Sequence, residues 1–408
     1  MPKDVTSGQV IWYERTVGSL IGRAETFNIR AGVSSSFSCP GPCPCAPVFA
    51  SAYLTPEFPQ TITFGTQVNF SAYEIDRDSC QSSSNYYGPF PVNGVSWSSN
   101  NTSIATVSPT VSSTTSATGV GVGSCRIYGS YNTIVAYANY PNPCTPISSN
   151  VNAYQDLTVT PRVTVTGAEL CADAIPLTLE PSSASGSFTL TLVSSAGSVD
   201  IVNESRNGGN YRDSFKLGTL PTRAFTSIQA TWVSNGQTGT GSRSYSFTVL
   251  GDYLTTCYVT ELESDYSGST FTAGTATSSC EWSSRSFFTG FLDKLNLNGS
   301  GIDSSNTALQ LEFTCTGAPP TSPPYGGWRY RRPTTITTSC GNQPSVGTTI
   351  ASPTLACGTL VRIDGLGCRR KQDTGGGLSS TQIDVYNGIG HSSCAGWSNI
   401  QRRVARID

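Results

Sequence analysis

The chain has 408 residues, of which only 12% are charged, and its 24 Lys and Arg nearly balance its 26 Asp and Glu. Nucleic-acid-binding proteins carry a strong basic excess, so this composition argues against nucleic acid as a partner. At roughly 100 to 200 residues per domain, the length predicts two to four domains.

The usual signatures of cofactor chemistry are missing from the sequence. His391 is the single histidine, which excludes zinc sites built on two or three histidines. We find no G-x-S-x-G motif for a serine nucleophile and no usable phosphate-binding loop. We therefore expect no cofactor, no metal and no nucleotide.

Cysteine usage predicts an exported protein of the cell envelope, cell surface or extracellular space. The chain contains 14 cysteines, and disulfides persist in oxidising compartments. Met1 to Val5 lack the apolar region of a signal peptide. Export would therefore need a removed signal, a start assigned too late or another route. A cytosolic protein with reduced thiols is the alternative.

Along the chain, the predicted secondary structure is almost entirely β. Short runs rich in Val, Thr, Tyr and Phe alternate with Ser, Gly, Asn and Pro turns, as at residues 60–64, 187–192 and 244–249. Alternation at period two between regular turns is typical of antiparallel strands. We expect an all-β chain with almost no helix.

Residues 1–45 have the composition of a Cys- and Pro-rich leader. It ends in residues 39–45, where prolines alternate with cysteines and glycine. Proline prevents this run from continuing a helix or a central strand. The segment is either a disulfide-tied linker or a metal-binding knot, and the lack of a supporting histidine favours the linker.

Residues 46–160 carry the sequence Val95 to Val107, VSWSSNNTSIATV. This run resembles the bacterial immunoglobulin-like domain of group 2, in which a strand with a buried Trp leads into an S-x-N turn and an I/V-A-T-V strand. The resemblance implies a β-sandwich that serves as a spacer or adhesion module. We expect Trp97 to lie in the core, as in other sandwiches, and assign it no binding role.

Residues 161–253 are interpreted as a second immunoglobulin-like sandwich. Alternating strands are expected near residues 188–193, 228–233 and 245–250. Cys171 is expected to pair outside or across this unit. No motif here indicates any chemistry.

Residues 254–408 contain the most informative motifs, QDTGGG at residues 372–377 and QIDVYNGIG at residues 382–390. They resemble the 3D domain, named for three aspartates, and the related MltA-type lytic transglycosylases, which read D-x-G-G-A-I-K-G-x-x-x-D-[IV]-Y with the same spacing. AGWSN at residues 395–399 resembles A-G-W-x-N of the transglycosylases. FTGF at residues 288–291 resembles their F-T-G-Y strand, and NGSG at residues 298–301 resembles a Q-G-S-G segment of 3D proteins.

This resemblance implies a double-psi β-barrel, a closed six-stranded barrel with a groove. Cleavage of a glycosidic bond needs an acid that protonates the leaving oxygen. The resemblance places that catalytic carboxyl at Asp384 and implies that Asp373 lines the groove and supports it. Two close carboxylates would raise one pKa. Candidate substrate-binding residues are Thr289, Thr374, Gly375, Gly376, Tyr386 and Trp397.

Simpler interpretations of these residues stay open. Asp373 before Thr-Gly-Gly also fits an Asx turn. Asp384 within a strand is costly unless it meets water, a groove or a partner. Asp364 is interpreted as a turn residue, and Trp397 could stack on sugar or pack in a core. His391 is expected on a loop and not as a ligand.

The sequence also departs from the family pattern. Ser352 stands near the position of the first aspartate, and residues 378–380 replace the I-K-G segment. Pro319–Pro324 and Arg329–Arg332 are expected to form a surface loop. Five further cysteines suggest local bridging, namely Cys315, Cys340, Cys357, Cys368 and Cys394.

Three functions follow from these features. The first is an exported lytic transglycosylase that acts on peptidoglycan glycan strands and forms 1,6-anhydromuramic acid, with the sandwiches as spacers. The second is a non-catalytic wall-binding or adhesion protein that keeps the barrel as a glycan-binding module. A third is an expansin-like loosening protein. Ser352 favours the second, and Asp373 with Asp384 favours the first. The sequence does not specify an oligomeric state.

Overall fold

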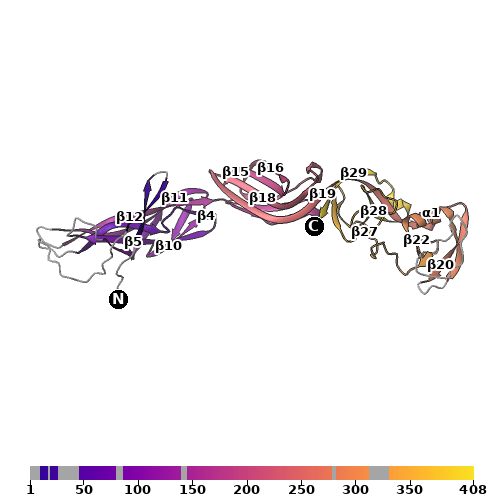
Figure 1. Ribbon diagram of the computed structural model, residues 1–408, viewed down its shortest axis with the longest axis horizontal. Helices are drawn as coiled ribbons and strands as arrows, with labels where there is room; N and C mark the ends of the chain where they lie inside the picture. The colour runs from indigo at the N-terminus through magenta and orange to yellow at the C-terminus, as the bar shows by residue number, and fades with distance from the viewer. Residues whose placement is uncertain are drawn as a thin grey trace.

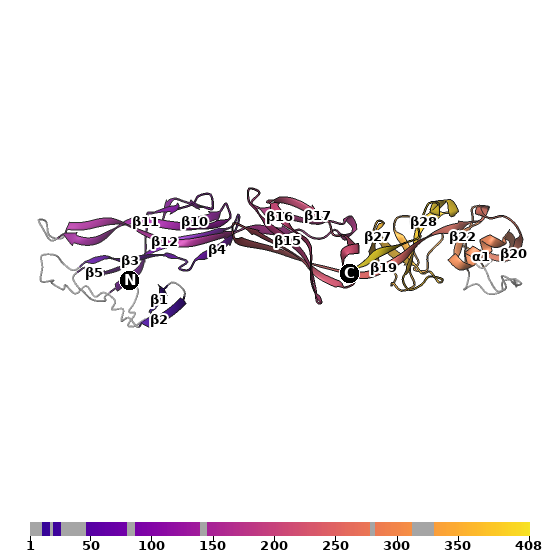
Figure 2. The same ribbon diagram turned by 90° about the horizontal axis from the view of Figure 1, so that it is seen from above.

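The computed structural model describes residues 10–16, 19–25, 46–79, 86–138, 145–277, 282–311 and 330–408. In these residues the chain is nearly all β, as predicted. The Cys-Pro run at residues 39–45, Pro319–Pro324 and Cys315 lie outside them. Figures 1 and 2 show an elongated molecule in which the successive parts of the chain follow one another along its length. No helix in the described ranges is both long and apolar enough to cross a membrane.

The first part of the chain builds a hairpin and a sandwich of two sheets. The strands β1 (Val10–Thr16) and β2 (Ser19–Glu25) pair antiparallel within the predicted leader. One sheet of the sandwich has the order β3 (Pro47–Thr55), β5 (Gln67–Asp78), β10 (Thr114–Gly119), β8 (Ala105–Ser108), with β6 (Tyr86–Pro91) on β5. The other has the order β4 (Gln60–Thr63), β12 (Thr145–Thr160), β11 (Gly123–Ala138), β7 (Val95–Ser99), β9 (Val111–Ser112).

One hydrophobic core joins these two sheets. Phe70 and Leu54 from the first sheet and Ile127 and Leu157 from the second are fully buried in it. Trp97 lies in the same core, as predicted, and its indole N–H donates to the carbonyl of Ser112 at 3.0 Å. That bond satisfies the polar atom which burial would otherwise leave unpaired.

The second part of the chain again has two sheets. The smaller consists of β13 (Arg162–Val165), β14 (Ile175–Glu180) and β17 (Gly209–Asp213). The larger has the order β16 (Gly197–Asn207), β15 (Ser185–Ser194), β18 (Ala224–Ser234), β19 (Gln237–Leu262). Phe215, Phe225 and Phe247 stack in the shared core beside Trp232. Short 3-10 turns lie at η1 (Leu170–Ala172) and η2 (Leu217–Thr219).

Strand β19 connects this part to the next without interruption. Its first half pairs with β18, and its second half pairs with β29 (Ile400–Ile407) and β28 (Gln382–Ile389). The predicted boundary between residues 253 and 254 falls inside this strand. A disulfide between Cys171 and Cys368 also crosses the junction, which confirms that Cys171 pairs outside its own unit.

The C-terminal part contains the closed six-stranded barrel that the resemblance implied. The order is β19, β28, β25 (Thr349–Ala351), β27 (Gly367–Asp373), β26 (Leu360–Ile363), β29, and β29 pairs back to β19. The pairs β19–β28 and β25–β27 are parallel, and the other four are antiparallel. The interior is filled by fully or almost fully buried aliphatic side chains, Ile350, Val361, Ile363, Ile383, Val385 and Val404.

A smaller sheet extends the barrel at one end of the molecule (Figure 1). Its order is β21 (Trp282–Phe288), β20 (Thr270–Thr277), β24 (Tyr330–Arg332), β23 (Ala308–Leu311), β22 (Ser300–Ile302), and β22 pairs with the end of β19. The loop predicted at Arg329–Arg332 is therefore wrong for its last three residues, because Tyr330 is fully buried in the sheet.

Helix α1 (Thr289–Asn298) covers this sheet and corrects the strand expected at residues 288–291. Phe291, Leu292 and Leu295 are fully buried at helical spacing against the sheet core. Gly299 ends the helix with a φ of 81°, and its N–H donates to the carbonyl of Leu295. A four-residue motif carries too little of the helical period to predict the helix.

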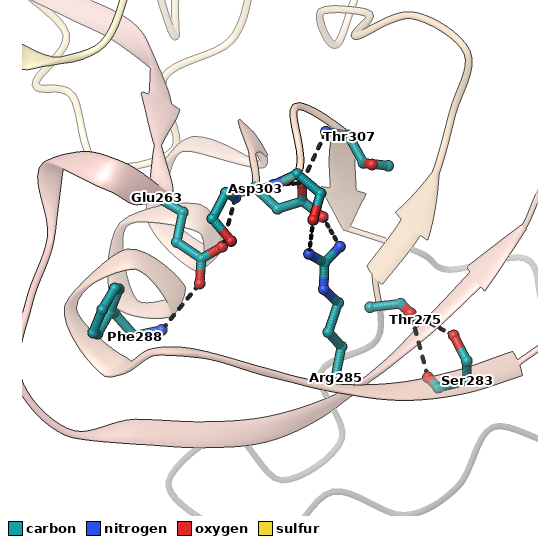
Figure 3. Close-up of polar contacts among 9 residues, drawn as sticks. Glu263, Thr275, Ser283, Arg285, Phe288, Asp303 and Thr307 are labelled. Atoms are coloured by element: carbon teal, nitrogen blue, oxygen red, sulfur yellow. Dashed lines mark hydrogen bonds and ion pairs between the residues drawn. The ribbon is translucent and has the colours of Figure 1, made fainter.

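Buried carboxylates fix the turns of this smaller unit (Figure 3). Glu263, in η3 (Glu263–Asp265), accepts from the N–H groups of Phe288 at 3.3 Å and Ser304 at 2.8 Å. Asp303 accepts from the N–H groups of two turn residues and forms an ion pair with Arg285. Since these carboxylates are saturated by donors, they hold the α1 entry and the β22–β23 turn in place.

Candidate functional site

A cavity of about 400 Å³ lies between the barrel and the smaller sheet unit. The barrel contributes residues from β19, β27 and β28, and the smaller unit contributes the C-terminal end of α1 and parts of β22, β23 and β24. The segment 336–344 forms a further wall. Its polar lining includes Asn296, Asn298, Ser300, Gln310, Arg331, Thr337, Thr338 and Ser339, and Tyr258, Asp373, Thr374 and Tyr386 line its barrel side.

Asp384 occupies a strand position that points away from the barrel interior. Its neighbours Ile383 and Val385 are buried in the barrel core, so alternation places Asp384 and Tyr386 on the opposite face of β28. Thr256 lies beside Asp384 in the parallel β19 register, and its hydroxyl donates to the carboxyl group. Gln382 in turn donates to the Thr256 hydroxyl at 3.0 Å.

Burial raises the pKa of Asp384 to about 6, and a hydrogen bond from Gln382 acts in the opposite direction. The sequence argument attributed such a shift to a second carboxylate. The structure corrects that cause, because removal of the carboxyl group from water is the main contribution. A carboxyl group with this pKa holds its proton in a substantial fraction of molecules at mildly acidic pH.

Asp373 lies at the end of β27 and is held by three donors. Its Oδ1 accepts from the N–H groups of Ser339 at 3.0 Å and Thr374 at 2.9 Å, and its Oδ2 accepts from the hydroxyl of Tyr258 at 3.3 Å. Its bond to Thr374 goes to the N–H of the next residue, whereas an Asx turn uses the N–H two residues on. The side chain also lines the cavity. All of these contacts use the carboxyl group as an acceptor.

Tyr258 lies next to both aspartates, and sequence reasoning missed it. The rings of Tyr258 and Tyr386 meet edge to face with centroids 5.4 Å apart. The pKa of the Tyr258 hydroxyl is raised, and burial is the largest cause. The negative charges of Asp373 and Asp384 raise this pKa further. No motif marks Tyr258 or Thr256 in sequence. Strand pairing with β28 alone brings them beside Asp384.

The glycine-rich turn at residues 375–377 lies near the last turn of α1. A Cβ at Gly375 would lie 2.2 Å from Leu378, whereas a Cβ at Gly376 would meet nothing within 4 Å. A Cβ at Gly377 would lie 3.7 Å from the side chain of Leu297, which lines the cavity and is 61% exposed. The turn thus leaves open space at Gly376, and Leu378 fills the space beside Gly375.

The predicted site residues that do not line the cavity are Asp384, Thr289, Gly375, Gly376 and Trp397. Thr289 begins α1, where its hydroxyl lies 3.2 Å from the carbonyl oxygen of Ser269. Trp397 packs against the barrel core, and its indole N–H donates to the carbonyl of Thr255 at 3.4 Å. Ser352 is fully buried, and its N–H donates to the carbonyl of Asp373 at 3.1 Å.

His391 lies in the short helix η4 (His391–Cys394) instead of a loop. Its Nε2 is 3.0 Å from Oε2 of the buried Glu261 and 2.9 Å from the hydroxyl of Tyr266. Among the described residues, no group of three or more His, Cys, Asp or Glu side chains could hold a metal ion. The His391 contacts connect η4 to the end of β19 and to Tyr266, which follows η3.

Comparison with known proteins gives only distant likenesses. No family model matches the sequence, and no curated protein matches it. A crystal structure of E. coli MltA with bound chitohexaose is similar at 12% identity with a TM-score of 0.28, covering 44% of this chain and 76% of that one. A second E. coli MltA structure, described as a unique lytic transglycosylase fold, gives 13% identity and a TM-score of 0.27, covering 45% and 76%.

Proposed function

We propose that the cavity binds a peptidoglycan glycan strand and that Asp384 cleaves it as a lytic transglycosylase. The observation that carries this proposal is the geometry of β28, where Asp384 shares a strand face with Tyr386, which lines the cavity of about 400 Å³. Burial of the Asp384 carboxyl group raises its pKa to about 6. A general acid must hold its proton near the working pH, and burial supplies that property here. The residue pattern around Asp373 and Asp384 supports the same assignment.

One carboxyl group can perform both halves of the reaction. Protonated Asp384 donates its proton to the glycosidic oxygen, and the bond from that oxygen to the muramyl anomeric carbon breaks. The resulting carboxylate then accepts the proton of the muramyl 6-hydroxyl as this oxygen attacks the anomeric carbon. The products are a free 4-hydroxyl and a 1,6-anhydro ring, and no water is consumed.

Asp373 supports this chemistry without exchanging a proton. A hydrolase usually uses a second carboxyl group as nucleophile or base. Here that second group, Asp373, already accepts from Ser339, Thr374 and Tyr258. We infer that Asp373 holds Tyr258 in position and stabilises the positive charge that develops on the sugar ring.

The rest of the molecule fits work outside the cytosol. Three disulfides join described cysteines, Cys171–Cys368, Cys257–Cys394 and Cys340–Cys357, and such bonds persist in oxidising compartments. The two N-terminal sandwiches precede the barrel along an elongated molecule (Figure 1). We infer that they act as immunoglobulin-like spacers that present the barrel to the cell wall.

A non-catalytic glycan-binding module is the second candidate, and one observation favours it. Asp384 is not among the residues that line the cavity, and the Thr256 hydroxyl engages its carboxyl group. Unless substrate reaches past Tyr258 and Tyr386, the groove would bind a glycan without cutting it. The two candidates differ in whether purified cell wall releases soluble fragments.

The test is digestion of purified cell wall with mass analysis of the products, alongside a pull-down on the same material. Wild type should release 1,6-anhydro fragments, and Asp384→Asn should bind but release none. Asp293→Asn, which makes the same change on the exposed face of α1, is the matched control and should cleave normally. Binding without cleavage by the wild type would support the second candidate. Fragments with a free reducing-end muramic acid would contradict the transglycosylase. A wild-type protein that does not bind the cell wall would contradict both candidate functions.

A further inference from the structure

A buried lysine lies directly against the Cys340–Cys357 disulfide, beneath one wall of the cavity. Lys371, on β27, is only 4% exposed. Its Nζ is 3.4 Å from Sγ of Cys340, 3.3 Å from Sγ of Cys357 and 2.9 Å from Oγ1 of Thr374. The ammonium therefore contacts both sulfurs of a disulfide at once.

Within the described part of the chain, none of the hydrogen-bond partners of Lys371 carries a negative charge. A buried ammonium without a counter-ion is costly, and disulfide sulfur is a weak acceptor. If the disulfide were reduced, a thiolate at either cysteine would lie within ion-pair distance of this ammonium. The charge of Lys371 thus favours the reduced form over the oxidised one.

The two cysteines differ in access. Cys357 belongs to an exposed stretch, whereas Cys340 is partly buried. A thiolate from solvent therefore reaches Cys357 more readily, and Cys340 becomes the leaving group. Stabilisation of the leaving thiolate accelerates thiol–disulfide exchange, and the ammonium lies 3.4 Å from this atom.

We propose that Cys340–Cys357 is a redox modification site whose co-reactant is a dithiol reductant. The first thiolate of the reductant attacks Sγ of Cys357, and the electron pair of the S–S bond leaves on Cys340 as a thiolate paired with Lys371. The second thiolate of the reductant then attacks the reductant sulfur that is bonded to Cys357 in the mixed disulfide. Cys357 leaves as a thiolate, which takes a proton from water. Two electrons pass to the protein, and the reductant ends as a cyclic disulfide.

Reduction would loosen the cavity wall next to Asp373. The N–H of Cys340 donates to the carbonyl of Gln372 at 3.2 Å, and Ser339 donates to the carboxyl group of Asp373. Thr338 and Ser339 both line the cavity. The Cys340–Cys357 bond joins the segment 336–344 to the turn that precedes β26. Its loss removes a covalent restraint from a wall of the groove, whatever ligand the groove binds.

The other two disulfides between described cysteines provide internal controls. Cys171–Cys368 and Cys257–Cys394 join segments separated by 197 and 137 residues. Among the described residues, no lysine or arginine donates a hydrogen bond to their sulfur atoms. Cys171 is itself exposed, so access alone does not distinguish this bond from Cys340–Cys357.

The experiment is partial reduction of the full chain with increasing dithiothreitol, followed by alkylation and peptide mapping. We expect Cys340–Cys357 to open first, because an adjacent opposite charge lowers the pKa of an acidic group by about 1–3 units, equivalent to on the order of tenfold or more in the reduction equilibrium. Hydrogen exchange in residues 336–344 should rise over the same range of reductant.

Lys371→Gln keeps a donor for Thr374 but removes the charge, and it should make Cys340–Cys357 harder to reduce by on the order of tenfold. Lys294→Gln, on the exposed face of α1, is the control and should change nothing. Equal reduction of Lys371→Gln and wild type would overturn the proposal. If the Lys371 variant does not fold, the order in wild type decides, because earlier opening of Cys171–Cys368 would also overturn it.

Discussion

The raised pKa of Asp384 predicts that this residue destabilises the protein at neutral pH. Its carboxyl group has a pKa of about 6 in the folded chain and about 3.9 in an unfolded one. The folded state therefore binds more protons between these values, and the free energy of unfolding falls as pH rises through this window. Two pKa units correspond to about 3 kcal/mol, which partial solvent access reduces to about 2 kcal/mol.

Asp384→Asn removes this cost because an amide does not ionise. We expect the variant to be more stable than wild type by about 2 kcal/mol at pH 7.5, and the gain to vanish near pH 4. Urea unfolding of both proteins across pH 4 to 8 measures the difference. A stability difference that is constant with pH would refute the assignment of the shifted pKa to Asp384.

The same geometry makes three further predictions. Cleavage that needs protonated Asp384 should decline as pH rises above about 6, by about tenfold per unit in kcat/KM, and a profile that is flat to pH 8 would contradict the assignment. Tyr258→Phe should leave the melting temperature nearly unchanged but lower kcat by about tenfold, because Asp373 loses a donor; an effect on stability alone would make Tyr258 structural. Gly375→Ala should lower the melting temperature, since its Cβ would overlap a packed side chain, whereas Gly376→Ala should not; equal effects in thermal melts would contradict this turn geometry.

Local patterns in the sequence predicted some candidate residues of the site but none of the contacts between distant segments of the chain. The sequence indicated that Asp384, within a strand between Ile383 and Val385, would be costly unless it met water, a groove or a partner, and in the structure its carboxyl group accepts from the Thr256 hydroxyl. Thr256 and Tyr258 could not be found in the same way. They reach Asp384 only through a parallel pairing between segments more than a hundred residues apart. The cause of the pKa shift was missed for a similar reason, since burial depends on the whole fold.

Helix α1 illustrates a second limit. Its Phe291, Leu292 and Leu295 follow helical spacing, but the run is short and two of its ten residues are asparagine, which has low helix propensity. Packing against the smaller sheet therefore decides its structure. That outcome matters for the site, because the last turn of α1 brings Leu297 and Asn298 to the cavity.

The continuity of β19 leads to a prediction about the smallest unit that can fold. A fragment of residues 254–408 would begin inside this strand and would leave the C-terminal half of β29 paired only with β26, because its β19 partners Val249 and Phe247, which face Ala405 and Ile407, would be missing.

The same cut would remove Leu250 and Tyr253 from the barrel core, and it would leave Cys368 without Cys171. Arg362, which is 8% exposed and donates to the carbonyl of Leu170, would lose that acceptor. Because the fragment loses a strand partner, two core side chains and a disulfide at once, we expect it to be insoluble or unfolded. A fragment of residues 161–408 keeps all of these contacts and should show a cooperative melt. If the shorter fragment melted cooperatively at the same temperature, the second sandwich would be a separate spacer, and the continuous strand would carry no stability across the junction.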